Sequence, residues 1–355
     1  MNKSLSETID FLRFPLACMV VLLHLPGKYT NWSSYSFLDF LSFSIYDYLT
    51  LMTNIIGQIA VPVFFCISGY LFYCDDKIKY QSKMKSRTKS VLVPYLLWNV
   101  IALFLMVIVK GIGVILNNRD IQGLIDYLSP INIVKYILGN FDNLYTWQPI
   151  DAPLWFIRDL YIMFLLYPVI YFLLRRYKKP WGGGILLLYI SGVAGIPCLQ
   201  MQTIFFFSLG VYMHMYNVNI LKQMTCKKLY SIAFVAFVSF VIRFIWGYGY
   251  LMPVFILSFS GLMVYWLSFI QEKKLSVRIR AMKKYSFFIF ASHILIVDRL
   301  YFLFYHPLFV NNEILHIISY FLNPVVTVIM CISLFHVLKR ISPNFLSVLI
   351  GTRIN

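Results

Sequence analysis

The sequence predicts an all-α, polytopic membrane protein, and three observations support this prediction. Of the 355 residues, 60% are hydrophobic and only 13% are charged, whereas a soluble globular protein is about a quarter charged. Apolar runs close to the length of a bilayer-spanning helix recur along the whole chain. The basic residues gather in short segments between these runs, mostly on one side of the membrane. We therefore expect a single membrane domain over residues 1–355.

About ten apolar runs predict ten transmembrane helices. In chain order they cover residues 9–26, 57–74, 90–109, 152–174, 182–199, 203–219, 229–247, 252–270, 285–304 and 315–338. The first run lacks a small-residue cleavage site, so we expect it to be retained rather than removed as a signal peptide. The sequence shows no internal repeat, no linker and no fused soluble esterase-like domain. We expect a stand-alone membrane unit.

The positive charge is strongly one-sided. The segments 75–89, 175–181, 220–228 and 271–284, together with the two ends of the chain, hold 23 of the 31 lysines and arginines. Because cytoplasmic segments of membrane proteins carry the excess of basic residues, both termini are expected in the cytoplasm and the protein in the cell (inner) membrane. The net charge of +17 then reflects topology, and we expect no nucleic-acid partner.

The longest segment expected outside, residues 110–151, is too polar to span the bilayer. Its stretch IVKYIL (133–138) predicts a short interfacial helix. The six cysteines lie in or beside apolar runs without metal-binding spacing, so we interpret them as small hydrophobic residues and expect no metal site. Signatures of nucleotide-binding loops, zinc proteases and serine hydrolases are absent from the sequence.

Two ionisable residues lie in the first predicted helix, IDFLRFPLACMVVLLHLP (9–26). Such residues are costly inside a bilayer and are candidates for function. Arg13 and His24 are eleven residues apart, which on an α-helix is three turns plus about 20°, so they share one face roughly 16 Å apart along the axis. Arg13 is expected near the cytoplasmic end and His24 beyond the midplane. The spacing alone leaves a second interpretation open, in which Arg13 snorkels and pairs with Asp10 while His24 is a structural histidine.

A second group of charges lies in the fourth predicted helix. The stretch PLWFIRDLY (153–161) carries Arg158 and Asp159 close to Trp155. Neighbouring residues on a helix point about 100° apart, so we expect Arg158 and Asp159 to serve different partners. In FFCISGYLF (64–72) the Ser68-Gly69 step predicts a close approach between helices.

The later predicted helices carry further ionisable residues. In ASHILIVDR (291–299), His293 is followed by Asp298 and Arg299. Arg243 and Arg299 lie near outer helix ends, where we expect snorkelling. The remaining histidines within or beside the spans are interpreted as structural: His214, His306, His316 and His336.

These segments, in this order, resemble the acyltransferase 3 family of bacterial integral-membrane acyltransferases. An arginine followed by ten residues and a histidine, in a frame like IDxLRxxA…H, is similar to residues 9–24. FFCISGYL (64–71) resembles the family's FFxISGYL pattern, and PLWFIRDL (153–160) resembles its PLWFLRDL box. Further similar patterns are the basic segment running into Pro94-Tyr95, FFFSLGVYM (205–213) and Ser286…His293.

The departures from the family pattern are small. The usual glycine after Arg13 is Phe14, and a Tyr-Leu-Leu-His ending is Phe290-Ala291-Ser292-His293. The resemblance covers most of the chain. It implies an O-acyltransferase that moves an acyl group, most often acetyl, from cytoplasmic acyl-CoA to a hydroxyl of a glycan or lipid-linked glycan at the outer face, and it implies that Arg13 and His24 are required.

The residues fit this implied chemistry. CoA carries several phosphates, so a cationic mouth of Arg13, Lys85, Arg87 and Lys89 is expected to hold it as a co-substrate, without a permanently bound cofactor. His24 is expected to act as general base on the acceptor hydroxyl, with a covalent acyl-imidazole as the variant.

The remaining candidates have auxiliary roles. We expect Asp10 to orient Arg13. Arg158 and His293 are expected to stabilise the oxyanion or bind the acceptor. Ser68, Trp155 and Asp159 complete the candidate acceptor site.

Two other classes stay open from the residues alone. A transporter or flippase for a lipid-linked sugar or small metabolite also carries buried charges, although the sequence shows no two-half symmetry. A membrane sensor that only binds ligand is the other. The identity of the acceptor, the choice among acetyl, succinyl and longer donors, and the oligomeric state, including a homodimer, are not predicted.

Overall fold

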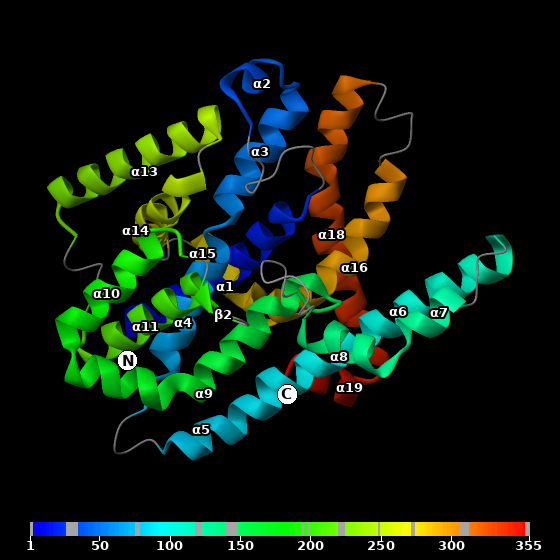
Figure 1. Ribbon diagram of the computed structural model, residues 1–355, viewed down its shortest axis with the longest axis horizontal. Helices are drawn as coiled ribbons and strands as arrows, with labels where there is room; N and C mark the ends of the chain where they lie inside the picture. Colours follow the sequence, from blue (N-terminus) through cyan, green and yellow to red (C-terminus); the bar gives the residue numbers. More distant parts are fainter. Residues whose placement is uncertain are drawn as a thin grey trace.

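A computed structural model describes residues 3–25, 35–74, 79–117, 122–139, 148–193, 195–196, 199–218, 224–247, 249–270, 274–304 and 312–351. These residues form the predicted all-α fold, in which helices cross at varied angles around a shared apolar core (Figure 1). The longer helices are α1 (Lys3–Leu23), α3 (Ile45–Gly57), α4 (Ala60–Phe72), α6 (Val93–Asn117), α9 (Trp155–Arg176), α10 (Lys178–Ile190), α11 (Met201–Met215), α13 (Cys226–Trp246), α14 (Met252–Ile270), α16 (Ser286–Phe304) and α18 (Glu313–Ile341).

Short elements connect these helices. They are α2 (Phe37–Leu41), α5 (Tyr80–Arg87), the π-helical turn η1 (Thr88–Leu92), α7 (Gln122–Tyr127), α8 (Pro130–Leu138), α15 (Lys274–Ala281), α19 (Pro343–Leu349), and the 3₁₀ turns η2 (Ala152–Leu154), η3 (Gly249–Leu251) and η4 (Met282–Tyr285). Two strands of two residues each, β1 (Gly195–Ile196) and β2 (Leu199–Gln200), pair antiparallel.

Five helical stretches of the described chain are long and apolar enough to cross a membrane. They cover Ile45–Phe72, Tyr80–Ile115, Ala152–Arg176, Cys226–Trp246 and Glu313–Ile341. Many large apolar side chains on α6, α13 and α18 are exposed, as expected for surfaces that face lipid rather than water. The protein is therefore a polytopic membrane protein, and the count of ten spans stays a prediction.

Several predicted boundaries are wrong in an instructive way. The segment 75–89, predicted as a loop, is helical from Tyr80 onward and continues through η1 into α6. The predicted span 182–199 ends as a helix at Ile190, because Gly192 adopts a left-handed φ of 74°. Hydropathy reports which residues suit lipid, not where a helix starts or ends, and Lys-, Gln- and Met-rich segments such as α5 are good helix formers outside the bilayer.

Two helices, α3 and α8, lie in segments that connect predicted spans. Helix α3 begins with a capping box, in which Ser44 and Asp47 satisfy each other's main-chain N–H groups. The predicted helix at 133–138 is confirmed as α8, which begins at Pro130 in the favoured first-turn position. Its interfacial location stays a prediction.

Helices α4 and α11 pack closest, at two glycines. A Cβ atom on Gly69 would lie 3.2 Å from Cα of Phe207 and closer still to its carbonyl oxygen. A Cβ on Gly210 would lie 2.7 Å from the main-chain nitrogen of Tyr70. The close helix approach predicted from the Ser68-Gly69 step is therefore confirmed, and it depends on the absence of side chains at both crossing positions.

Helix α1 runs through the interior and contacts α3, α4, α15, α16 and α18. Two polar contacts align it with α16. In its first half Asp10 meets Lys283 of η4, directly before α16, and past its end His24 meets His293. Asp10 precedes His24 in the chain, and Lys283 likewise precedes His293, so α1 and α16 run in the same direction.

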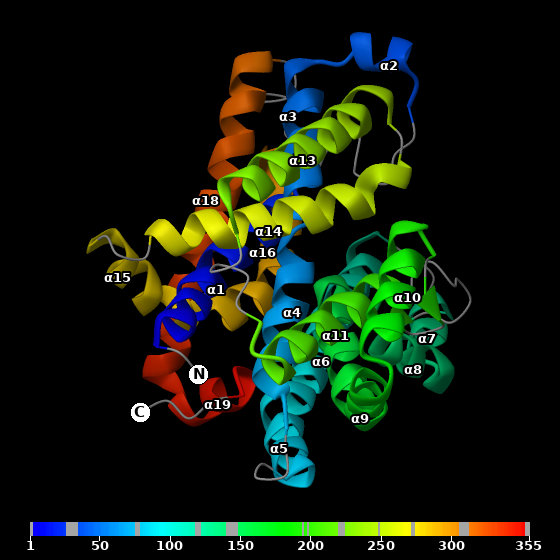
Figure 2. The ribbon, with the colours of Figure 1, turned by 90° about the vertical axis from the view of Figure 1, so that its left-hand side faces the viewer.

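Helices α5 and α19 lie at the end of the molecule opposite α2 in both views (Figures 1 and 2). The indole N–H of Trp98 on α6 donates to the main-chain oxygen of Leu349 on α19 at 3.1 Å. The carboxyl end of α4 is held by Lys83, whose Nζ donates to the carbonyl oxygen of Tyr73 at 2.6 Å. The last described helix is thus tied to the same end of the bundle as α5.

Candidate active site

The two candidate catalytic histidines predicted from separate helices meet in space. The ring centroids of His24 and His293 are 5.2 Å apart, with the ring planes tilted by 46°. His293 lies on α16 and is fully buried. His24 follows the last residue of α1, where its main-chain N–H still donates to Val21 at 3.2 Å. One site therefore combines the half-buried histidine that follows the first helix with the buried histidine of the ninth predicted span.

Aromatic side chains link this pair to α9 and α4. Phe290, one turn before His293, packs edge-on against Phe156 at 5.4 Å, and Phe156 packs against Phe65 at 4.6 Å. Trp155 lies 6.2 Å from the same Phe65 ring. These contacts place the beginning of α9 beside the histidine-bearing helix and exclude water from the space between them.

Ser68 is half-buried on α4. It follows Phe64 by four residues and Phe65 by three, and both of these rings contact Phe156. Residues at these spacings share one helix face. Ser68 is therefore on the side of α4 that faces α9, while the backbone at Cys66 and Tyr70 faces α11.

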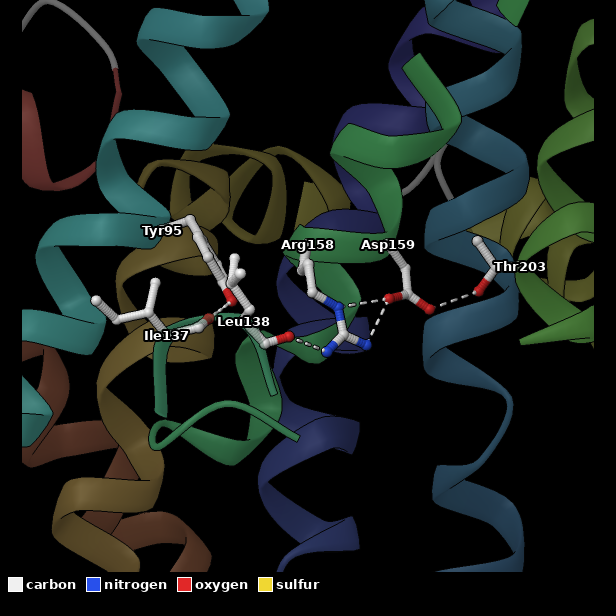
Figure 3. A network of polar contacts seen from close by, with 6 residues as sticks. All are labelled: Tyr95, Ile137, Leu138, Arg158, Asp159 and Thr203. Carbon is white, nitrogen blue, oxygen red and sulfur yellow. Dashed lines mark hydrogen bonds and ion pairs between the residues drawn. The ribbon is translucent and has the colours of Figure 1, made fainter. Parts of the chain in front are cut away.

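Arg158 and Asp159 bond to each other, so the prediction that they serve separate partners is wrong (Figure 3). Arg158 Nη2 donates to Oδ1 of the fully buried Asp159 at 2.8 Å, and Nε does so at 3.0 Å. The long Arg158 side chain can bend toward Asp159, the next residue of the helix, even though the two Cα–Cβ bonds point in different directions.

The same network reaches two other elements (Figure 3). Arg158 Nη1 donates to the main-chain oxygen of Leu138 at 2.8 Å, and the hydroxyl of Thr203 on α11 faces Asp159 Oδ2 at 3.5 Å. Close by, the hydroxyl of Tyr95 on α6 donates to the main-chain oxygen of Ile137. The network ties the end of α8 to α9 and α11, which gives Arg158 a positioning role.

A charged cluster surrounds Arg13, at the middle of α1 (Lys3–Leu23). Asp10 Oδ1 lies 3.7 Å from Arg13 Nη1, and Asp10 Oδ2 lies 2.5 Å from Lys283 Nζ. Arg280 on α15 pairs with Glu7 at 3.1 Å. Arg13 and Arg87 are near enough to repel each other electrostatically, and the Arg87 guanidinium lies 5.7 Å from the centroid of the Phe164 ring.

This cluster contains residues that sequence reasoning did not single out. The pairing of Arg13 with Asp10 was expected, but Lys283 and Arg280 were counted only as part of a basic segment. Their position immediately before the Ser286…His293 pattern is the signal that was available. Lys85 and Lys89 are exposed on α5 and η1, on either side of Arg87.

The remaining histidines of the described chain have structural partners, as interpreted from the sequence. His214 Nδ1 lies 2.7 Å from the main-chain oxygen of Tyr70. His336 Nε2 lies 2.9 Å from the hydroxyl of Tyr285. His316 stacks on Tyr46 at 3.6 Å. His306 and the side chains of Asp298 and Arg299 lie outside the described residues.

The prediction that Arg243 snorkels is wrong. Its side chain is only 1% exposed, and its guanidinium lies 5.6 Å from the centroid of the Tyr35 ring. The Tyr35 hydroxyl donates to the main-chain oxygens of Arg243 at 3.1 Å and Phe244 at 2.7 Å. A segment far away in sequence covers this arginine, which hydropathy cannot reveal.

Within the described ranges, no three histidine, cysteine, aspartate or glutamate side chains lie close enough together to hold a metal ion. The site offers an imidazole pair beside aromatic side chains, joined by one helix to a cationic cluster. That combination is suited to proton transfer at the imidazole pair and to anion binding at the cationic cluster.

Comparison with known proteins identifies the class. The model of the acyltransferase 3 family, an acyltransferase domain, matches residues 6–338, so the chain belongs to this family. The resemblance seen in the sequence is thereby confirmed. The protein is a membrane acyltransferase.

One curated relative is the succinoglycan biosynthesis protein ExoH of Rhizobium meliloti (strain 1021). The two are 26% identical over 387 residues, covering 99% of this chain and 94% of the relative. No solved structure matches the chain.

Proposed function

We propose that the protein transfers an acyl group from cytoplasmic acyl-CoA to a hydroxyl of a cell-surface glycan or lipid-linked glycan, with His24 as general base. The observation that carries this proposal is the arrangement of α1. One helix bears the cationic cluster around Arg13 and ends at His24, which is half-buried beside the fully buried His293. At 1.5 Å per residue the two sites are roughly 16 Å apart along the axis, a gap that the pantetheine arm of CoA can bridge.

The cationic cluster is suited to the phosphates of CoA. Arg13, Arg87 and the exposed Lys85 and Lys89 offer charge-assisted donors, and an arginine can grip a phosphate with two parallel hydrogen bonds. Lys283 supports this role indirectly. Because it lies 2.5 Å from Asp10, it neutralises that carboxylate and leaves more of the Arg13 guanidinium available to an anion.

The chemical step needs one base. His24 removes the proton of the acceptor hydroxyl as the oxygen bonds to the thioester carbon. The carbon–sulfur bond then breaks, CoA leaves as a thiolate, and the proton on His24 passes to that thiolate. The aromatic side chains beside the pair exclude water and so limit hydrolysis of the thioester. Arg158, Asp159, Trp155 and Ser68 are proposed to shape the acceptor site beside it.

The topology proposed here has ten spans with both termini in the cytoplasm. Two helix pairs support it. The first and ninth predicted spans, α1 and α16, run in the same direction, as two odd-numbered spans must. Helices α4 and α11, the second and sixth spans, also run together, since the later residues Tyr70 and His214 meet beyond the glycine crossing. The cytoplasmic placement and the inner-membrane location rest on the one-sided basic residues.

A glycan acceptor is supported by the relative ExoH, which is a succinoglycan biosynthesis protein. Acetyl is the donor group that we propose first, and succinyl is the alternative that the experiment must include.

The test incubates the purified full chain with radiolabelled acetyl-CoA or succinyl-CoA and a cell-envelope glycan fraction from the native bacterium. We expect free CoA to appear together with label in the glycan, and His24→Ala to abolish both. A transporter would release no CoA and label no acceptor, and that result would refute the proposal. Full activity of His24→Ala would refute the general-base role alone.

A further inference from the structure

His293 is held in one orientation by its own helix. Its Nδ1 lies 2.8 Å from the main-chain oxygen of Phe290 and 3.1 Å from that of Ile289. Carbonyl oxygens only accept hydrogen bonds, so Nδ1 must carry the hydrogen and donate it. In the neutral imidazole the second nitrogen, Nε2, then holds a lone pair and can only accept.

That accepting nitrogen has no partner in the described part of the chain. Nε2 of His293 is buried and makes no hydrogen bond there, although buried polar atoms in proteins are nearly always paired. The ring beside it is that of His24, at a centroid distance of 5.2 Å. The accepting Nε2 of His293 therefore lies beside His24, the proposed base, and has no hydrogen-bond partner among the described residues.

His24 occupies a different kind of position. It follows the last residue of α1 and lies in the turn that ends the helix, where its main-chain N–H donates to Val21. His293, by contrast, stands in mid-helix beside Ser292, whose hydroxyl donates to the main-chain oxygen of Phe288 at 2.7 Å. A rigid acceptor next to another imidazole is the arrangement in which a supporting residue sets the orientation of a base.

We propose that His293 is a positioning residue for His24, and that it acts by accepting a hydrogen bond from one ring nitrogen of His24 at its Nε2. This inference rests on the proposed function. The ring centroids are 5.2 Å apart, whereas the hydrogen bond requires about 3 Å between the two nitrogens, and catalytic hydrogen bonds often tighten only when substrate is bound.

The consequence is a defined tautomer of the base. With one nitrogen of His24 donating to His293, the other is unprotonated and faces the acceptor hydroxyl. When it takes the hydroxyl proton, His24 becomes an imidazolium, and the hydrogen bond to the His293 lone pair stabilises this cation. The proton then leaves with the CoA thiolate, and His293 itself gains and loses none. In this role His293 does not donate to the oxyanion.

The test compares two amides of different length. In His293→Gln the amide oxygen can occupy the position of Nε2 and accept from His24. In His293→Asn the shorter amide reaches only the position of Nδ1. We expect His293→Asn to lower kcat about 10–100-fold with the KM for acyl-CoA unchanged, and His293→Gln to restore kcat to within about threefold of wild type. Equal activity of the two variants, whether high or low, would overturn the proposal.

A double variant separates positioning from an independent role. In the His24→Ala background, adding His293→Asn should leave the residual rate unchanged, because a residue that acts only through His24 has nothing left to act on. A further drop would overturn the proposal and favour direct contact with substrate. The elution volume and Tm of each variant in detergent exclude misfolding. Failure of the proposed function is distinguishable, because wild-type protein would then transfer no label at all.

Discussion

Two regions of α1 hold their functional groups in opposite ways. At the middle of the helix, the side chain of Arg13 is 39% exposed and shares Asp10 with Lys283, in a region crowded with other cations. Just past the end of the helix, the half-buried His24 packs against the fully buried ring of His293. In the exposed cluster, several charges that solvent screens each contribute a part of the binding energy, whereas in the histidine pair the chemistry depends on a few ring nitrogens. Substitutions should therefore have graded effects around Arg13 and severe effects at His24.

The largest expected effect is that of substituting His24. His24→Ala should lower the acyl-transfer rate by about 10²–10⁴-fold, the usual contribution of a positioned general base. Label transfer to glycan, measured with purified protein, checks this. His336→Gln is the matched control, since His336 bonds to Tyr285 away from the pair, and it should keep near-normal activity. Comparable loss in both variants would remove the distinction between the catalytic and structural histidines.

Substitutions in the exposed cluster around Arg13 should weaken the binding of acyl-CoA. Arg13→Ala should raise the KM for acyl-CoA about 10–100-fold, because a charge-assisted contact to phosphate is lost, with a smaller change in kcat. Arg13→Lys should recover part of it. The KM should also rise with salt in the wild type, and less steeply in Arg13→Ala. A kcat effect at saturating donor, without a KM effect, would show that Arg13 takes part in chemistry instead.

The fold that holds both regions of α1 in place is expected to be most easily destabilised at the crossing of α4 and α11. Gly69→Ala should destabilise the fold by about 1–3 kcal/mol, because its Cβ would meet the main chain of Phe207. Gly111→Ala on α6 is the matched control, since nothing lies within 4 Å of its Cβ position, and it should be neutral or stabilising. Thermal unfolding in detergent measures both. Equal Tm values would mean that the two helices separate at no cost.

The smallest effects are expected from the outermost cations. Lys85 and Lys89 are exposed, so Lys85→Ala or Lys89→Ala should each raise the KM for acyl-CoA about fivefold at most. The double variant should come close to the product of the single effects. An effect as large as that of Arg13→Ala would shift the centre of the donor site from α1 to α5.

The sequence was sufficient for the fold class and for the candidates His24 and His293, because lipid exposure and buried ionisable residues leave local patterns. It did not predict that these two rings meet, nor that Lys283 neutralises Asp10, since each contact joins segments from opposite ends of the chain. Helix α3 was missed because the predicted span began at residue 57, although Ile45–Phe72 is one long apolar helical stretch. Helix α5 was missed because its polar, Lys-rich sequence gives no hydropathy signal. Burial of Arg243 under Tyr35 is likewise a tertiary event without a local signal.

The pairing of Arg158 with Asp159 was missed for a different reason. Helix geometry separates neighbouring Cβ atoms by about 100°, but a long guanidinium side chain can fold back across that angle. The prediction used the direction of the Cβ and not the reach of the side chain. The sequence indicated which residues belong to the candidate site. It did not indicate which residues bond to each other, because these pairs depend on tertiary packing.

The central claim is that one helix joins a cytoplasmic donor site to a half-buried base, and the sidedness of the reaction tests it most directly. Sealed inside-out vesicles, with the cytoplasmic face outward, receive labelled acetyl-CoA or succinyl-CoA from outside, and right-side-out vesicles receive the same. We predict CoA release and labelled glycan in inside-out vesicles. Right-side-out vesicles should show neither until they are permeabilised. Arg13→Ala should abolish both signals in inside-out vesicles at low donor concentration. Equal labelling in intact vesicles of both orientations would contradict the account.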